Sequence, residues 1–578
     1  MKTGKSTIKY LMLLFLGVAV GCTDRFDEMN TNPNDFTDES VSPAFFVSKI
    51  LKETNVQGRY AFWRGPLIHG DRFADHVRFG FASSWWNDGL SYEYHNSYTD
   101  AFWSTYFKNV PVNINKMMEM TVEGGPQEND KLYAVALILR AQFFQMMTDA
   151  FGDIPFSQAG FPEYSTPEYD DQKEIYKTLI AELGKAIDTI GDATTSGDGA
   201  HDLAGGDIMY DGDLQKWKRY ANTLRLRLAL RAHGAPGADF ADAAITASLG
   251  APLMESADDI AKIERDRIIS KWGSSGYNTV WWDFSWTNAA RWKLSKSLVD
   301  MLRDNEDPRL FKIARPLEGG DIKFTLPKDA TEKADLLKRL TYIRNVLDEA
   351  GVTHTYKEES EGTGEEQKDV ATISIEKDKF YAGQPSRFNN KIQPVVRFEF
   401  FSSPSEYVVA DKQDLNAAGD LMPALAMTTA EAYFLRAEAI LKGIGSGSAE
   451  DMYRRGIEAS MMQWGVDEAD ITAFLAKPIA SLGGNATENL EKVYNQRWLA
   501  DFGLGFEAWA VMRDTGYPMS ATADVPEDEY HDKGTVGVGI PFRMRYPSSE
   551  ATLNGSNMDA AIARQGENVQ ATKLWWAK

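Results

Sequence analysis

A short stretch near the middle of the chain concentrates side chains that could bind the flat face of a ligand. Between residues 271 and 292, seven of the 22 residues are aromatic: Trp272, Tyr277, Trp281, Trp282, Phe284, Trp286 and Trp292. They are mixed with Gly, Ser, Asn and Asp without a clear period, which is typical of a loop and not of a packed helix or strand. Aromatic rings held on a loop can form a stacking platform, but a loop packed onto its own rings would have the same composition. The stretch predicts a binding surface, with a self-packed loop as the alternative.

Residues that could perform catalysis or hold a metal form no comparable cluster in the sequence. There is no HExxH and no GxSxG motif, and Cys22 is the single cysteine. His69 and His76 are seven residues apart and could share one helix face, but the residues between them do not predict a firm helix. The acidic 205–213 segment lacks the glutamate and the spacing of an EF-hand, and a turn capping a helix at Asp213 explains it better. We therefore expect no catalytic residue, no metal site and no cofactor.

Amphipathic helices are predicted on both sides of the aromatic loop. Apolar residues recur at spacings of three and four in six segments: 131–147, 172–190, 214–233, 429–442, 451–464 and 490–502. Asp171 and Asp213 are the expected N-caps of two of them, and Gly443 is a C-cap signal. The helices come in pairs without the strict 34-residue signature, which favours degenerate tetratricopeptide-type hairpins. Trp103 and Tyr106 follow a helical spacing and are assigned to the core.

Long turn-rich regions lie between the helices, at roughly 59–100, 150–170, 250–292 and 305–425. Within the last of them, the acidic segment 357–369 has no aromatic residue and is interpreted as a mobile, solvated insertion. Segments 371–375 and 393–401 are the best strand candidates, and they could pair as a small hairpin. Trp272 and Trp292 flank the aromatic loop and are expected to be packed.

The N-terminus has the features of a secretory leader. Three lysines precede a ten-residue apolar run from 11 to 20, which is too short to span a bilayer. Cys22 follows it and resembles the lipidated cysteine of a bacterial lipoprotein, although Ala19 departs from the usual lipobox. An ordinary leader with an incidental cysteine is the alternative. We expect a signal peptide at 1–21, a lipidated tether at 22–40 and a single domain at 41–578.

The net charge of −22 argues against a nucleic-acid partner, because such partners are bound by excess positive charge. After the leader, no other segment approaches 18 consecutive apolar residues.

The order of motifs along the chain resembles the SusD/RagB family of surface nutrient-binding lipoproteins, in the branch with an N-terminal Asn-Pro-Asn signature. The motifs follow Cys22 nearly to the end of the chain: FDEMNTNPN (26–34), TDAFGDIPFSQA (148–159), YDGDLQKWKRYANTLRLRLALR (210–231), SLVDMLRDNEDPRL (297–310), MTTAEAYFLRAEA (427–439), YNQRWLADFGLGFEAWAVMRDTGYP (494–518) and IPFRMRYPSSEATLN (540–554). Segment 357–369 matches none of them.

This resemblance implies a mostly α-helical fold with four degenerate tetratricopeptide-type hairpins, long loop insertions and minor β-hairpins. It implies a surface-exposed outer-membrane protein, anchored to lipid through Cys22. The protein would capture an oligosaccharide, or in some relatives a peptide, and pass it to a SusC-like TonB-dependent transporter without catalysis.

The resemblance also implies that a second loop, 72–98, joins the aromatic stretch in forming the ligand arc. Both loops carry rings for the apolar face of a sugar and polar groups for its hydroxyls. The candidate ligand-binding residues are Trp85, Trp86, Asn87, Asp88, Tyr92, Tyr94, Tyr277, Asn278, Trp281, Trp282, Asp283 and Trp286.

Two other classes of protein remain open from the sequence. A secreted α-helical glycoside hydrolase would need two carboxylates across a cleft, and 84 acidic residues can always supply such a pair. A structural or adhesion protein would use its aromatic patches for protein contacts. The ligand, whether a particular glycan or a peptide, is not encoded in any motif.

Overall fold

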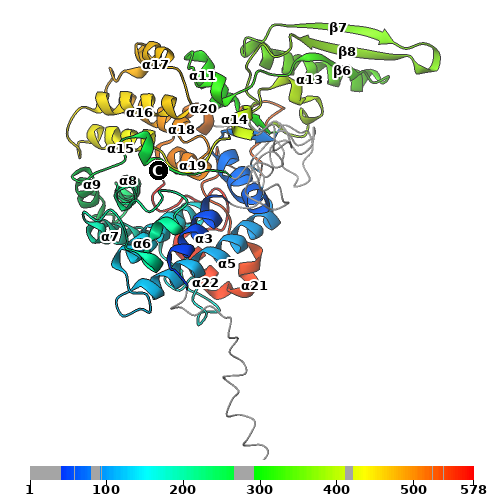
Figure 1. Cartoon of the computed structure of the whole chain (residues 1–578). Helices are drawn as coiled ribbons and strands as arrows, with labels where there is room; N and C mark the ends of the chain where they lie inside the picture. The colour runs from blue at the N-terminus through cyan, green and yellow to red at the C-terminus, as the bar shows by residue number, and fades with distance from the viewer. Residues whose placement is uncertain are drawn as a thin grey trace, which may run out of the picture.

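The computed structural model describes residues 41–56, 59–79, 92, 94–265, 292–409, 421–523, 525–534, 536–537 and 539–577. The described part is mostly helical, as the sequence predicts (Figure 1). Among these residues no helix is both long and apolar enough to cross a membrane.

Antiparallel helices packed in chain order build the body of the protein. The N-terminal half contains α3 (Ala44–Asn55), α4 (Arg59–Phe62), the π-helix η1 (Trp63–Asp71), α5 (Asn96–Thr121), α6 (Asp130–Phe151), α7 (Gln172–Ile190), α8 (Leu214–Ala232) and α9 (Ala241–Leu249). The C-terminal half contains α15 (Thr429–Leu441), α16 (Ala449–Gln463), α17 (Glu468–Leu475), α18 (Ala486–Ala500), α19 (Gly505–Thr515), α20 (Met519–Thr522), α21 (Ser548–Leu553) and α22 (Gly555–Gln565). Each of α6 to α8 packs against its successor, as do α15 and α16, while α18 packs on α15 and α19.

The six helices expected from hydrophobic periodicity are α6, α7, α8, α15, α16 and α18. Asp171 accepts hydrogen bonds from two backbone N–H groups at the start of α7, and Asp213 does the same at the start of α8, so both predicted N-caps are confirmed. Gly443, just after α15, has a φ of 77°, which favours glycine. Trp103 and Tyr106 of α5 are buried, as expected. The predicted turn-rich region 59–100, however, holds α4, η1 and the start of α5.

The strands are short and pair in four small sheets. The antiparallel pairs are β1 (Val77–Phe79) with β5 (Trp292–Leu294), β2 (Ile154–Pro155) with β3 (Tyr169–Asp170), and β4 (Ala261–Ile263) with β9 (Ala424–Met427). The fourth sheet has the order β6 (Gly320–Thr325), β8 (Lys368–Ile375), β7 (His354–Glu361). The remaining α-helices are α11 (Lys296–Asp304), α12 (Leu310–Ile313), α13 (Ala330–Glu349) and α14 (Glu406–Val409). The 3-10 helices are η2 (Gly199–His201), η3 (Leu203–Gly205), η4 (Ala257–Asp259), η5 (Gly364–Glu366), η6 (Gln393–Val395), η7 (Phe398–Phe400) and η8 (Pro478–Ala480).

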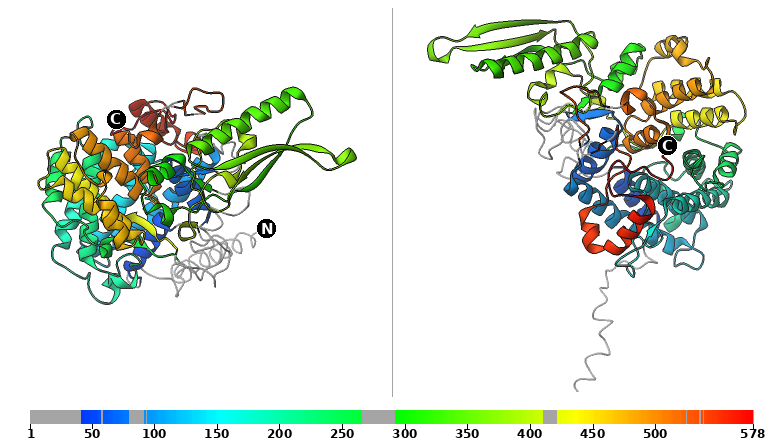
Figure 2. Two further views of the ribbon diagram at one scale, coloured as in Figure 1. Left: turned by 90° about the horizontal axis from the view of Figure 1, so that it is seen from above. Right: turned by 180° about the vertical axis from the view of Figure 1, so that it is seen from behind.

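A segment that we call the insertion, residues 326–380, projects from the helical body together with β6 (Figures 1 and 2). Its helix α13 and its strands β7 and β8 pack, together with β6, residues 382–401 and Tyr530, around a second hydrophobic core that is separate from the main one. Side chains of β6, β8 and α13 meet in this second core: Ile322, Phe324, Leu340, Ile343, Leu347, Ala371 and Ile373. The prediction of one domain over 41–578 did not foresee a second core.

The structure changes two expectations about the region 305–425. Segment 357–369 lies in the insertion and is mostly exposed, as expected, but it has regular structure: most of it belongs to β7, η5 and β8, and Glu361 and Glu359 pair with Lys323 and Lys357. Segment 393–401 is not a strand: it forms η6 and η7, where Pro394 lacks the N–H that a strand ladder needs. The 20-residue helix α13 was not expected at all. The strand at 371–375 is confirmed within β8, but its partners are β6 and β7.

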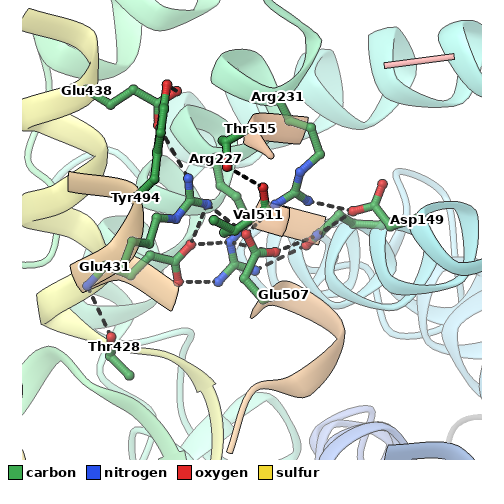
Figure 3. Close-up of polar contacts among 12 residues, drawn as sticks. Asp149, Arg227, Arg231, Thr428, Glu431, Glu438, Tyr494, Glu507, Val511 and Thr515 are labelled. Atoms are coloured by element: carbon green, nitrogen blue, oxygen red, sulfur yellow. Dashed lines mark hydrogen bonds and ion pairs between the residues drawn. The ribbon is translucent and has the colours of Figure 1, made fainter. Parts of the chain in front are cut away.

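A buried network of charged side chains joins α8, α15, α18 and α19 (Figure 3). Arg227 of α8 donates two hydrogen bonds to the carboxylate of Glu431 on α15, at 2.6 and 2.5 Å. Glu507 of α19 accepts hydrogen bonds from Arg231 and from Arg497 of α18. Burial raises the pKa of Glu507, but the three arginines outweigh it and hold that pKa well below its usual range. The charges are therefore satisfied only when these helices are docked as observed.

Asp149 extends the network to α6 and α7. Its carboxylate accepts hydrogen bonds from Arg231 at 2.6 Å, from the indole N–H of Trp576 at 2.9 Å and from the hydroxyl of Tyr176 on α7. One buried carboxylate thus links three helices and the C-terminal segment, which fixes the scaffold that carries the loops.

Candidate ligand-binding site

The two loops that the sequence singles out are attached to neighbouring positions of one small sheet. Strand β1 leads into residues 80–91, and β5 follows residues 266–291. The register pairs Phe79 directly with Trp292, so the last described residue before one loop faces the first described residue after the other. Their rings contact edge to face, with centroids 5.4 Å apart. The structure therefore brings together the points at which the two loops leave the sheet. We call the paired strands at these points, Val77–Phe79 and Trp292–Leu294, the loop root.

A buried ion pair between Arg78 and Asp75 stabilises the loop root. The guanidinium of Arg78 donates hydrogen bonds to the carboxylate of Asp75 and to the hydroxyl of Tyr92. Its central carbon, Cζ, lies 4.5 Å from the centre of the Tyr92 ring. Burial lowers the pKa of Arg78, but Asp75 and Tyr92 outweigh it and the pKa is raised, so the side chain stays charged. Asp75 also accepts a 2.6 Å hydrogen bond from Ser297. Because Tyr92 follows the first loop and Ser297 follows the second, these contacts hold both loop ends.

Polar contacts from a third segment complete the root. Gln384 donates a side-chain hydrogen bond to the carbonyl oxygen of Phe79 at 3.0 Å, and its backbone N–H donates to the carbonyl of Leu294 at 2.8 Å. Lys293 is fully buried and donates to the hydroxyl of Ser403 at 2.8 Å. Side chains from four separated parts of the chain thus set the geometry from which the loops leave.

Most of the candidate ligand-binding residues lie outside the described residues: Trp85, Trp86, Asn87, Asp88, Tyr277, Asn278, Trp281, Trp282, Asp283 and Trp286. Cys22 and Trp272 also lie outside them. Tyr92 is buried, with 1 % of its surface exposed, so in this structure its ring packs below the surface. Tyr94 is half-buried; its hydroxyl donates to Asn96 at 2.9 Å and the guanidinium of Arg545 lies 4.5 Å from its ring. The expectation that Trp292 is packed is confirmed.

The histidines considered as a metal pair are buried and hydrogen-bonded to the backbone. A ring nitrogen of His69 lies 2.7 Å from the carbonyl oxygen of Arg64, and one of His76 lies 3.1 Å from that of Trp498. Burial lowers both pKa values to about 3, so both rings are neutral near pH 7. Within the described part of the chain, no group of three or more His, Cys, Asp or Glu residues is arranged to hold a metal ion.

The residues that build the root were missed by sequence reasoning. Arg78, Lys293 and Gln384 are polar, and polar side chains are usually assigned to the surface. The available signal was the apolar–polar–apolar pattern of Val77–Phe79 and of Trp292–Leu294. A pattern of three residues is too short to distinguish a strand from a turn.

Comparison with known proteins identifies the family. A family model for SusD-like proteins, described as starch-binding and associating with the outer membrane, matches residues 43–325 and 381–547. The chain belongs to the SusD-like family. The family model does not match residues 326–380, which form the insertion that contains α13, β7 and β8.

Solved structures of SusD-like proteins share the fold over nearly the whole chain. A chitin-binding protein is 25% identical with a TM-score of 0.68, covering 93% of this chain and 100% of that one. A SusD-like protein from Bacteroides thetaiotaomicron is 22% identical with a TM-score of 0.67, covering 93% and 98%. A chitin-binding SusD homolog from Flavobacterium johnsoniae is 21% identical with a TM-score of 0.66, covering 92% and 98%. Among curated proteins, none matches this chain.

Proposed function

We propose that this SusD-like protein is a cell-surface glycan-binding lipoprotein that captures an oligosaccharide and delivers it to a SusC-like TonB-dependent transporter. Residues 1–21 would be the signal peptide, Cys22 the lipidated first residue of the mature chain, and 22–40 the tether. Multiple acyl chains on one cysteine would suffice for stable anchoring in the outer membrane.

The observation that carries the proposal is the direct pairing of Phe79 with Trp292. This pairing brings together the described ends of the two loops, and it supports the proposal that Trp85 and Trp86 of one loop act together with Trp281, Trp282 and Trp286 of the other. Rings from both loops would pack on the apolar faces of sugar residues, while Asn87, Asp88, Asn278 and Asp283 would bind the hydroxyl groups. The family description and the chitin-binding relatives support a glycan as the ligand.

Binding and turnover can be measured together on the protein lacking residues 1–22. We would titrate it with maltoheptaose, chitohexaose and a peptide mixture by calorimetry, and follow product formation by chromatography. Trp281→Ala and Trp85→Ala should each weaken glycan binding about tenfold or more, because each removes one stacking ring. Tyr164→Ala, which removes an exposed ring from a different loop, is the matched control and should bind normally.

Three outcomes would contradict parts of the proposal. Turnover without lasting binding would favour a glycoside hydrolase. Binding of peptides but not of glycans would keep the capture mechanism and change the ligand class. Normal binding by every folded loop variant would refute the assignment of the site.

Anchoring and delivery need separate tests in cells. Cys22→Ala should release the protein from the membrane fraction and abolish its labelling by a fatty-acid probe. Affinity purification of the wild-type protein from outer membranes should co-purify a TonB-dependent transporter, and its absence would refute the delivery step.

A further inference from the structure

A groove lies between the insertion and the helical body. Its volume is about 800 Å³, within the range of about 300–1,000 Å³ that ligand sites occupy. One wall is the C-terminal part of α13, and the opposite walls are α11, α18 and residues 520–531, with residues 385–387 also lining it. In both side views α11 stands beside the insertion (Figures 1 and 2).

Contacts on either side of the groove hold its walls in place. Tyr530, from the body's C-terminal segment, packs into the second core, and its carbonyl oxygen accepts a 2.9 Å hydrogen bond from the backbone N–H of Asn389. Phe388 and His531 form an isolated antiparallel bridge. The groove is therefore built into the junction of two cores and does not depend on a ligand to form it. Junctions of this kind are preferred positions for ligand sites.

Charged side chains of both signs line the groove: three cations, Lys296, Arg387 and Lys492, and four carboxylates, Asp300, Asp304, Glu349 and Asp528. Several of them already have partners. Lys296 contacts Asp300 at 2.5 Å, and His531 contacts Asp528 at 2.9 Å. A polyanion or polycation would meet repulsion as well as attraction here. The lining therefore favours an uncharged ligand.

The same groove offers an aromatic ring and unused hydrogen-bonding groups. The ring of Tyr342 is held by Tyr530, with centroids 4.7 Å apart, and its hydroxyl forms no hydrogen bond with other described residues. The side-chain oxygen of Asn495 is buried without a hydrogen-bond partner in the described structure. Asn495 also lines the groove. Met301, Val346 and Val525 add apolar surface beside these groups.

We propose that this groove is a second carbohydrate-binding site, which takes an uncharged segment of a glycan chain. Tyr342 would pack on the CH-rich face of a sugar, with Asn495 and the paired charged groups binding its hydroxyls. The proposal rests on the proposed function in its choice of ligand class. The groove and the loop site consist of different residues, so an experiment can refute one of them without refuting the other.

The test combines a blocking variant with a binding footprint. Ala523 is exposed at the edge of the groove, so Ala523→Trp would fill the groove without disturbing a core. Ala560→Trp, at an exposed position of α22, is the matched control. Hydrogen–deuterium exchange of the protein lacking residues 1–22 would be measured with maltoheptaose and with chitohexaose. Slower exchange should appear in 296–305, 342–349 and 520–531 as well as in the aromatic loops.

Ala523→Trp and Tyr342→Ala should each abolish groove protection, with at least about tenfold weaker binding there, and leave loop protection unchanged. Trp281→Ala should abolish protection of the loops and leave protection of the groove unchanged. Protection confined to the loops, protection of the groove by peptides but not by glycans, or no protection with either sugar would overturn the groove proposal. Protection confined to the groove would uphold it and refute the loop site.

Discussion

Glu431→Ala would remove the acceptor of three hydrogen bonds at the centre of the buried charge network. The carboxylate accepts from Arg227 at 2.6 and 2.5 Å and from Arg497 at 3.3 Å. A hydrogen bond to a charged group contributes about 1.5–3 kcal/mol to stability. Glu507 stays within reach of both arginines, at 3.5 and 2.7 Å, and limits the loss. We expect the free energy of unfolding to fall by about 3–5 kcal/mol, as when one partner of a buried pair is removed.

Urea denaturation of the protein lacking residues 1–22 measures this loss as a lower midpoint at unchanged slope. Arg227→Met should cost a similar amount, and Glu431→Ala combined with Arg227→Met should cost less than their sum, because neither charge is then left unpaired. The control is the exposed pair Lys379–Glu376, where Glu376→Ala should cost under about 1 kcal/mol. If Glu431→Ala cost no more than Glu376→Ala, or if the two network substitutions were additive, the network would not hold the helices together.

Three further predictions follow from the loop root, the second core and a buried acid. Trp292→Ala removes a buried ring that contacts Phe79, so it should lower the free energy of unfolding by about 3–5 kcal/mol and also weaken glycan binding in calorimetry. Ile373→Ala should speed hydrogen exchange in the second core but leave α6 unchanged, because the two cores are separate. Burial raises the pKa of Asp71 to about 7, so the stability its proton provides at low pH is lost as the pH rises from about 4 to about 7. Asp71→Asn lacks this loss, and its stability relative to wild type should rise by about 1.4 kcal/mol per pH unit in urea titrations across that range.

Six helices of the body could be predicted because each carries its own local signals: α6, α7, α8, α15, α16 and α18. α7 and α8 begin at Asp171 and Asp213, and their apolar stripes bury one face against neighbouring helices. Such signals need no knowledge of the rest of the chain. Core assignments made on the same basis, such as Trp103, were confirmed for the same reason.

Strand β7 of the insertion could not be predicted because its pairing depends on contacts with another strand. Strand β7 is almost entirely polar, and it is a strand because β8 supplies its hydrogen-bond partners. Helix α13 was missed although it carries local signals like those of α7 and α8: Asp329 accepts hydrogen bonds from two backbone N–H groups at its start, and Leu340, Ile343 and Leu347 are buried at spacings of three and four. Local propensity favours a solvated loop for β7, and tertiary pairing overrides it.

The motifs that identify the family lie mainly in the scaffold and not in the ligand loops. Asp149, Arg227, Glu431, Arg497 and Glu507 all fall within those motifs, and all belong to the buried charge network. A buried charge that is left without its partner costs several kcal/mol, so a single member of this set cannot be lost without that penalty. The family is therefore recognisable from its scaffold, because the buried charges that join the helices lie in the same motifs by which the chain resembles its relatives.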